Sequence, residues 1–293
     1  MTGANGVLGK ALIRRLTEGR QTQVCALVRG TAQAAALDGL PVSVLQVDYG
    51  DTGSLADALK GVAAVVHLAG ALQPRSGERL QDANTETTRA VVTAAKAAGV
   101  ARFVYLSAPG AELFASNEYL RTKALAESTI RRAGFETLVF RVPMVLGAGT
   151  PSAQTLVKLA GKRVVPLVRG GRVRVQPVAL ADVTGAIRWA LGAEDPPVHV
   201  LDLVGPDTLT YVDLLHRAAT RLGRRPVVVG VPGWLAEGTA ALGDRLGWAW
   251  NRTLFDTLFN EHLGDATETR RLLPFPLTPV DELLDGLLAG SHG

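Results

Sequence analysis

The sequence predicts an α/β fold built on a doubly wound parallel sheet, and three observations support this prediction. Short β-branched apolar runs alternate with helix-like stretches over the first two-thirds of the chain, which is the rhythm of βαβ units. Most of these runs are apolar on both faces, as expected for a sheet that helices cover on both sides. A glycine-rich turn, TGANGVLG, opens the chain at residues 2–9.

Each predicted element follows from its local composition. β-branched and aromatic runs predict strands at 23–28, 42–47, 63–69, 102–107, 137–142 and 199–204. Helical spacing of apolar residues predicts helices at 7–16, 54–61, 84–99 and 119–134. Gly99 and Gly134 end the last two helices, and right-handed crossovers between the strands then give the doubly wound order.

The alternating rhythm loosens after residue 148, which predicts two regions. We expect a sheet-containing core over 1–148 and a smaller region for substrate or partner over 149–293, with about 172–205 returning to the sheet. Such a region would cover the carboxyl edge of the sheet, where open α/β folds bind ligands.

Composition excludes several classes of protein. Hydrophobic residues make up 47% of the chain and charged residues 20%, which is typical of a globular protein. The net charge of +4 is small, so the basic run from Arg163 to Arg174 favours a solvated face over nucleic-acid binding. The sequence has no long apolar run, its first ten residues lack the basic-then-apolar layout of a secretory signal, and Cys25 lacks the partners of a metal site. We expect a cytoplasmic protein without a transmembrane segment or a bound metal.

The glycines of TGANGVLG have the spacing of a phosphate-binding turn between a strand and a helix. Gly3 would permit the tight turn, Gly6 would let the backbone approach a pyrophosphate, and Gly9 would allow close packing of the helix. Such a turn predicts a dinucleotide-binding (Rossmann) core. The cofactor-binding residues expected in it are Gly3, Asn5, Gly6, Val7 and Leu8.

Two predicted strand ends bear on the identity of the dinucleotide. Arg29 stands where an acidic residue would bind the ribose 2′-hydroxyl of NAD, and its guanidinium suits a 2′-phosphate instead. We therefore expect NADP, with NAD as the alternative, although a solvated strand end would also explain Arg29. Asp48 and Tyr49 follow the next strand, where a carboxylate could accept the adenine amino group; the alternative is an ordinary turn.

Tyr119 and Lys123 form the most specific chemical pattern in the chain. Their spacing of four places both side chains on one face of a predicted helix. A nearby ammonium would lower the pKa of the phenol, so Tyr119 could exchange a proton with a carbonyl or an alcohol. Lys123 could also donate hydrogen bonds to the nicotinamide ribose. An isolated pair would be ordinary on an exposed helix, but the position after a sheet strand and an upstream glycine turn favours catalysis.

Together these segments resemble a short-chain dehydrogenase/reductase of the extended or atypical branch, similar to NAD-dependent epimerases and dehydratases. The resemblance covers roughly the first half of the chain and rests on TGANGVLG, VRG, VDYGD, HLAG, Asn84, FVYLSA, YLRTK and RVPMVLG. Downstream, QPVALADV and VGP resemble a subgroup that contains NmrA-like proteins and the nucleotide-binding accessory subunit of respiratory complex I. The resemblance implies further cofactor-binding residues at Leu68, Ala69, Gly70 and Pro143, the last near the nicotinamide.

The resemblance also implies a catalytic hydroxyl before the tyrosine. Ser107 is an imperfect substitute for it, because Ala108 occupies the position that carries the reactive hydroxyl in sugar-nucleotide epimerases. The segment from Ser107 to Tyr119 is also shorter than in that branch. Both departures weigh against epimerase or dehydratase chemistry.

Two functions fit these residues. The first is an NADP-dependent oxidoreductase acting on a small carbonyl, alcohol or quinone-like substrate. In it Tyr119 would move the proton, Lys123 would position the reacting groups, and Ser107 would polarise the substrate oxygen. The second is a protein that binds NAD(P)H without turnover, as a sensor or as a structural or assembly subunit. The Tyr119/Lys123 pair favours the first function, and Ala108 favours the second.

The C-terminal region holds Trp234, Trp248 and Trp250, followed by Phe255 and Phe259. The spacing of four between the phenylalanines predicts a buried helical face, and we expect the whole group to pack in a core. The alternatives are a wall for a lipid- or quinone-like substrate, or a patch that contacts a membrane surface or a partner protein.

The start of the chain leaves no room for a full strand before the glycine turn. In a doubly wound sheet that strand lies in the middle, between the strands that end near Val28 and His67. Met1 stands where the resembling family often has Val before Thr-Gly. We therefore hypothesise that the first strand is truncated in this sequence.

Overall fold

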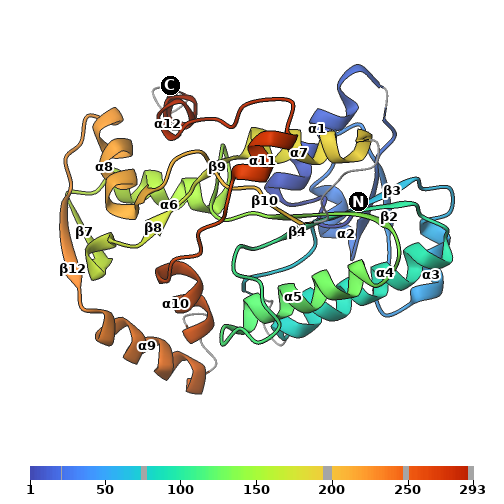
Figure 1. Cartoon of the computed structure of the whole chain (residues 1–293), viewed down its shortest axis with the longest axis horizontal. Coiled ribbons are helices and arrows are strands. Elements are labelled where there is room, and N and C mark those ends of the chain that lie inside the picture. Colours follow the sequence, from blue (N-terminus) through green and yellow to red (C-terminus); the bar gives the residue numbers. More distant parts are fainter. Residues whose placement is uncertain (21, 74–77, 194–199, 247–250, 290–293) are drawn as a thin grey trace. The chain divides into compact units, whose positions relative to one another are not determined.

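The computed structural model describes residues 1–20, 22–73, 78–193, 200–246 and 251–289 (Figure 1). The chain divides into two compact units. The first comprises Met1–Arg141 and Val183–Leu201, and the second comprises Val142–Asp182 and Asp202–Gly293. In the part of the chain that the structure describes, no helix is both long and apolar enough to cross a membrane.

The first unit is built on parallel strands, and it confirms the predicted α/β class. The strands are β1 (Cys25–Val28), β2 (Ser43–Gln46), β3 (Ala64–His67), β4 (Arg102–Ser107), β5 (Glu136–Arg141) and β10 (Val200–Asp202). β1 pairs in parallel with β2, and the other strands have the order β10-β5-β4-β3, in which β3, β4 and β5 run parallel. Each predicted strand is present, with bounds that differ by a few residues at most.

The first residues of the chain join the two groups of strands. Thr2 forms parallel bridges to Leu27 of β1 and to His67 of β3, so the chain enters its glycine turn from the middle of the sheet. This confirms the predicted place of the segment before the turn. The amino group of Met1 donates to the Cys25 carbonyl at 2.5 Å, and burial lowers its pKa to about 6.

Helices cover both faces of this sheet (Figure 1). They are α1 (Val7–Thr17), α2 (Thr31–Ala35), α3 (Thr52–Ala58), α4 (Thr87–Ala97), α5 (Glu118–Arg131) and the part of α7 (Leu180–Gly192) that starts at Val183. A short π-helical turn, η2 (Asp82–Glu86), leads into α4, and a 3-10 turn, η1 (Glu18–Arg20), follows α1. α3, α4 and α5 pack side by side on one face, with α1 on the other (Figure 1).

α3 begins earlier than the apolar spacing predicts. Asp51 precedes it, and its side chain accepts hydrogen bonds from the backbone N–H groups of Gly53 and Ser54, both at 3.0 Å. A carboxylate at this position satisfies amides that have no partner within the helix, so the helix starts directly after it. The predicted bounds of 54–61 were therefore displaced toward the C-terminus.

The second unit contains three two-stranded sheets and six helices among its described residues. β6 (Val145–Leu146) pairs with β9 (Val178–Ala179), β7 (Val164–Val168) with β12 (Val227–Val231), and β8 (Arg174–Val175) with β11 (Leu209–Thr210), the last pair antiparallel. The helices are α6 (Pro151–Ala160), α8 (Tyr211–Arg221), α9 (Gly233–Leu246), α10 (Arg252–Phe259), α11 (Thr267–Leu272) and α12 (Val280–Leu288), and η3 (Arg169–Gly171) is a short 3-10 turn. α6, α8 and α12 enclose its core.

The aromatic C-terminal region only partly follows the prediction. Phe255 of α10 is buried and its ring lies 5.3 Å from that of Phe259, so their predicted packing is confirmed. For Trp234 the expectation of core packing is wrong, because its side chain is 73% exposed. α9 buries Ala236 and Ala240 against α10, which leaves Trp234 on the outward side of the helix. Trp248 and Trp250 lie outside the described residues.

Candidate active site

The glycine turn has the close contacts that its spacing predicts. Gly3 has a positive φ of +66°, and a Cβ atom there would lie 2.7 Å from the carbonyl carbon of Leu68. A Cβ atom on Gly9 would lie 2.5 Å from the carbonyl oxygens of Gly3 and Ala4. α1 therefore starts tightly against the turn, and only glycine fits at either position.

The N-terminus of α1 lies directly after the glycine turn and has no side-chain cap. Gly6 is the N-cap residue. The first N–H groups of a helix have no acceptor within it, and together with the helix dipole they favour a phosphate. Val7 and Leu8 are the first residues of the helix, so they would contribute backbone amides, as predicted for a cofactor-binding turn.

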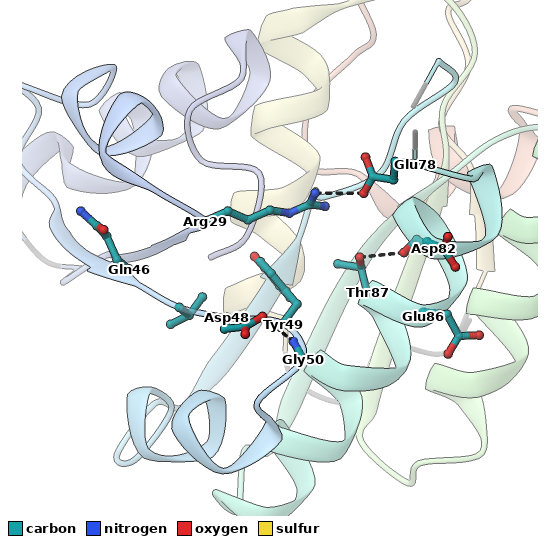
Figure 2. Close-up of a pocket in the computed structure, with 10 residues that line it drawn as sticks. Arg29, Gln46, Asp48, Tyr49, Gly50, Glu78, Asp82, Glu86 and Thr87 are labelled. Atoms are coloured by element: carbon teal, nitrogen blue, oxygen red, sulfur yellow. Dashed lines mark hydrogen bonds and ion pairs between the residues drawn. The ribbon is translucent and has the colours of Figure 1, made fainter. Parts of the chain in front are cut away.

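A groove runs from this turn along the carboxyl ends of the strands. One cavity of about 330 Å³ is lined by residues that include Gly3, Asn5, Gly6, Leu68, Ala69 and Gly70. A second cavity, of about 730 Å³, is lined by residues that include Gln46, Asp48, Gly50 and Glu86 (Figure 2). Arg29, Tyr49 and Glu78 line both cavities, which makes the groove continuous. Its glycine floor, free helix amides and length fit a dinucleotide.

Where the two cavities join, Arg29 lies between Tyr49 and Glu78 (Figure 2). Its Nη1 donates to Glu78 Oε1 at 2.9 Å, and its guanidinium carbon lies 5.5 Å from the centre of the Tyr49 ring. The Arg29 side chain is 36% exposed, so this ion pair is screened by water. Burial raises the pKa of Tyr49 to about 12 and Arg29 lowers it by a smaller amount, so Tyr49 is a neutral phenol.

Asp48 lies in an ordinary turn, which was the alternative to its binding the adenine amino group. Its Oδ1 accepts a hydrogen bond from the Gly50 amide at 2.8 Å (Figure 2). The residue is exposed and lines the larger cavity. The carboxylate thus stabilises the turn and also faces the groove.

A chain of hydrogen bonds fixes the wall of the groove around His67. The Ala69 amide donates to Thr2 Oγ1 at 3.2 Å, and Thr2 Oγ1 lies 2.7 Å from His67 Nδ1. On the other side, His67 Nε2 lies 2.9 Å from Thr88 Oγ1, which itself donates to the Asn84 carbonyl. We assign the proton to Nε2, because each hydroxyl then donates once and accepts once. Burial lowers the pKa of His67 to about 3, so this histidine is neutral and structural.

Asn84 holds the next part of the wall and was not predicted as a site residue. Its amide group donates to the Ala71 carbonyl and accepts from the Ala71 N–H, both at 2.9 Å. A Cβ atom on Gly70 would lie 2.8 Å from Asn84 Oδ1 and 3.4 Å from Lys123 Nζ. Glycine is therefore required at position 70 for the strand end, Asn84 and Lys123 to meet.

Lys123 is buried on α5 and contacts the end of β4. Its Nζ donates to the Leu106 carbonyl at 2.7 Å and lies 4.6 Å from the centre of the Tyr105 ring. Burial lowers the pKa of Lys123 to about 8, and the Glu127 carboxylate opposes part of this shift. Glu127 is itself buried and forms a paired ion contact with Arg141, at 3.0 and 2.8 Å. This buried ion pair behind Lys123 was not predicted.

The predicted direction of the Tyr119 pKa shift is wrong for the structure described here. Burial raises the pKa of Tyr119 to about 12, whereas we expected the ammonium of Lys123 to lower it. The reason lies in the contacts of Lys123, whose ammonium is directed to the Leu106 carbonyl and the Tyr105 ring. Desolvation of the phenolate then dominates.

Ser107 ends β4 in the same region. It is 4% exposed, and its Oγ has no hydrogen-bond partner among the residues that the structure describes. A buried hydroxyl without a partner costs about 1 to 3 kcal/mol. Such an atom is suited to bind a polar group of a ligand. Pro143, by contrast, belongs to the second unit, two residues after β5.

Comparison with known proteins identifies the family. A family model described as NAD(P)H-binding matches residues 3–182, which is more than half of the chain. The chain therefore belongs to this NAD(P)H-binding family, and the similarity to extended short-chain dehydrogenase/reductases is confirmed.

Individual relatives include reductases and a subunit of a respiratory complex. The chain is 29% identical over 235 residues to the ceramide reductase of Caulobacter vibrioides, covering 79% of this chain and 73% of the relative. It is 27% identical over 252 residues to the mitochondrial NADH dehydrogenase [ubiquinone] 1 alpha subcomplex subunit 9 of Arabidopsis thaliana, covering 83% of this chain and 62% of that one. The crystal structure of an NADPH-dependent quinone oxidoreductase from Escherichia coli with NADPH shares the fold, with a TM-score of 0.73 and 24% identity over 98% of each chain.

Proposed function

We propose that this protein is an NADPH-dependent reductase of a carbonyl or quinone-like group. The observation that carries the proposal is the arrangement at the end of β4. The unpartnered hydroxyl of Ser107 follows directly on the carbonyl of Leu106 that holds Lys123, and Lys123 also borders Gly70 in the wall of the groove. Tyr119 precedes Lys123 by one helical turn. These are the groups that a carbonyl reduction requires.

The raised pKa of Tyr119 suits the direction of reduction. When bound, the reduced nicotinamide supplies a hydride to the substrate carbon. Tyr119 is protonated at neutral pH, so it can transfer its phenolic proton to the substrate oxygen, and the product is an alcohol. Solvent then returns a proton to the phenolate.

Ser107 and Lys123 have separate supporting roles. The hydroxyl of Ser107 donates to the substrate oxygen, which orients it and stabilises the negative charge that develops there. Lys123 remains held by the Leu106 carbonyl and uses its other N–H groups to bind the nicotinamide ribose. The Glu127 carboxylate, which is paired with Arg141, favours the charged form of Lys123.

Arg29 is the basis for proposing NADPH rather than NADH. Arg29 directly follows β1 and lines both cavities of the groove. A 2′-phosphate would accept its N–H groups, in competition with Glu78. The glycine turn, the first amides of α1 and the backbone of residues 68–70 would hold the rest of the cofactor.

A nucleotide-binding role without turnover is the second candidate. Ala108 stands in place of the reactive hydroxyl of epimerases, and one relative is a subunit of mitochondrial NADH dehydrogenase. In that role the same groove would bind NADPH, and Tyr119 would have no acid function. The two candidates agree on binding and disagree on turnover.

Cofactor binding and turnover are therefore tested together. Purified full-length protein is titrated with NADPH and with NADH, and nicotinamide absorbance is then followed with ketones, aldehydes, quinones and long-chain lipid ketones. The lipid ketones are included because one relative is named a ceramide reductase. We expect tighter binding of NADPH and its oxidation by at least one of these classes. Tight binding without oxidation by any of them would support the second candidate.

A further inference from the structure

The second unit exposes an apolar face that the reductase chemistry does not use. On β7 and β12, Val164 and Val227 form a register pair, and Pro166 and Val229 form another. All four are exposed, with Val164 at 54% and Val227 at 62%, while the alternate residue Val165 is fully buried in the core. A two-stranded sheet that is apolar on its outer side as well as its inner side has an unpartnered face.

α9 exposes further apolar residues. It follows β12 directly (Figure 1). Trp234, Gly238 and Leu242 follow one another at intervals of four, with Leu235 beside them, and all are exposed. Val168, at the end of the outer row of β7, packs against the buried side of α9. We group the exposed apolar residues of β7, β12 and the α9 helix that follows them as the docking face: Val164, Pro166, Val227, Val229, Trp234, Leu235 and Leu242.

Four cations gather at the end of the docking face that is distant from α9. Lys162 and Arg163 immediately precede β7, and Arg224 and Arg225 lie just before β12. Because β7 and β12 are parallel and in register, both pairs are brought to the same end. All four are exposed, and none of them forms an ion pair with another described residue.

We propose that the docking face binds the surface of a lipid bilayer that contains anionic lipids. Exposed aliphatic side chains and an indole enter the boundary between headgroups and acyl chains, and nearby free cations bind anionic headgroups. Sedimentation equilibrium distinguishes a second copy of the chain from a bilayer as the occupant of this face. This proposal is independent of the proposed reductase activity.

Vesicle flotation of the full-length protein tests the proposal. The probes are vesicles of phosphatidylcholine alone and of phosphatidylcholine mixed with phosphatidylglycerol. We expect binding to the anionic vesicles that weakens with added salt, and little binding to phosphatidylcholine alone. The double variant Arg224→Glu/Arg225→Glu should lower the partition coefficient about thirtyfold. The double variant Trp234→Ser/Leu235→Ser should lower it at least tenfold, by roughly the loss of two buried apolar side chains.

Matched controls lie in the first unit. Arg131→Glu/Arg132→Glu reverses another exposed arginine pair, and Phe114→Ser removes an aromatic side chain that is 98% exposed. Both should bind anionic vesicles like the unchanged protein. Equal losses in the controls, or no binding of the unchanged protein to anionic vesicles, would overturn the proposal. So would a dimer in sedimentation equilibrium that Trp234→Ser/Leu235→Ser dissociates, because the face would then belong to a second copy.

Discussion

The two ends of the candidate site differ in their access to water. At the end formed by Lys123, Ser107 and His67, every one of these side chains is at most 6% exposed. At the end formed by Arg29 and Asp48, the arginine is 36% exposed and the aspartate is exposed as well. We call them the buried end and the open end.

This difference predicts that substitutions at the buried end act on turnover and that substitutions at the open end act on cofactor binding. At the buried end, desolvation shifts pKa values strongly: that of Lys123 falls to about 8, that of His67 falls to about 3 and that of Tyr119 rises to about 12. Polar interactions in such an environment are strong and sensitive to geometry. At the open end water screens the Arg29–Glu78 pair, so changes there should have modest effects and act on binding.

The largest expected effect is on turnover, from Tyr119→Phe at the buried end. Removing the phenolic proton should lower kcat by about 100-fold or more, the usual contribution of a general acid. The Kd for NADPH should change less than about twofold, because the phenol is not part of the open end. Stopped-flow oxidation of NADPH and a binding titration measure the two quantities. A turnover rate that survives the substitution would show that Tyr119 is not the proton donor.

The next largest effect is on stability, from Lys123→Met. The pKa of Lys123 is about 8 in the folded protein against 10.5 for an ordinary lysine, so the folded state binds this proton more weakly than the unfolded state. The charge therefore destabilises the fold below about pH 8, and the penalty disappears as the pH rises toward 10.5. At pH 7 the variant should gain about 1 to 3 kcal/mol in the free energy of unfolding. This is the gain from removing the buried charge, less the cost of losing the hydrogen bond to the Leu106 carbonyl.

Urea unfolding at pH 7 and at pH 10 measures this effect. The gain should be smaller at the higher pH, and the variant should lose turnover. Lys96→Met, at an exposed position on α4, is the matched control and should change stability by less than about 0.5 kcal/mol at either pH. A Lys123→Met protein that is less stable than the original at pH 7 would contradict the assigned shift.

A smaller effect is expected at the open end from Arg29→Asp. NADPH should bind about tenfold more weakly, because the 2′-phosphate loses a charge-assisted partner and meets a carboxylate. NADH lacks that phosphate and should bind almost as before. Arg14→Asp, which changes the same charge at an exposed position of α1, should leave both affinities unchanged. Equal weakening of NADPH and NADH would remove the basis for preferring NADPH.

The smallest effect should come from Glu78→Gln. Loss of the carboxylate releases Arg29 from its ion pair and removes a negative charge from the groove. Since exposed pairs contribute about 0.2 to 1 kcal/mol, NADPH should bind about two- to fivefold more tightly at low salt. The gain should fade as ionic strength rises, and calorimetric titration at two salt concentrations would show it. Weaker binding of NADPH would mean that Glu78 orients Arg29 rather than competing for it.

The open end and the glycine turn could be predicted from sequence, and the electrostatics of the buried end could not. The tight turn at Gly3 and the place of Arg29 directly after a strand follow from position in a local pattern. The pKa of Tyr119 depends instead on how far α5 and β4 exclude water around it, and the contact between Lys123 and the Leu106 carbonyl joins residues on different elements. Apolar periodicity carries no information about such distances.

Other misses have local explanations. The Asp51 cap that starts α3 was readable in the sequence, since an aspartate before a helix is a common start signal. Trp234 was expected in a core together with Phe255 and Phe259, but small residues on the opposite side of α9 make the packed face. Glu127 lies one turn after Lys123, and that spacing is the signal that would have identified it.

The most direct measurement is a crossed comparison of Arg29→Asp and Tyr119→Phe, in which the NADPH Kd and the single-turnover rate of NADPH oxidation are determined for each. We predict that Arg29→Asp changes the Kd about tenfold with little change in the rate at saturating NADPH, and that Tyr119→Phe lowers the rate about 100-fold with little change in the Kd. A Tyr119→Phe protein that reduces substrate at the original rate, or an Arg29→Asp protein that binds NADPH as tightly as before, would contradict the division of the candidate site into a selecting end and a reacting end.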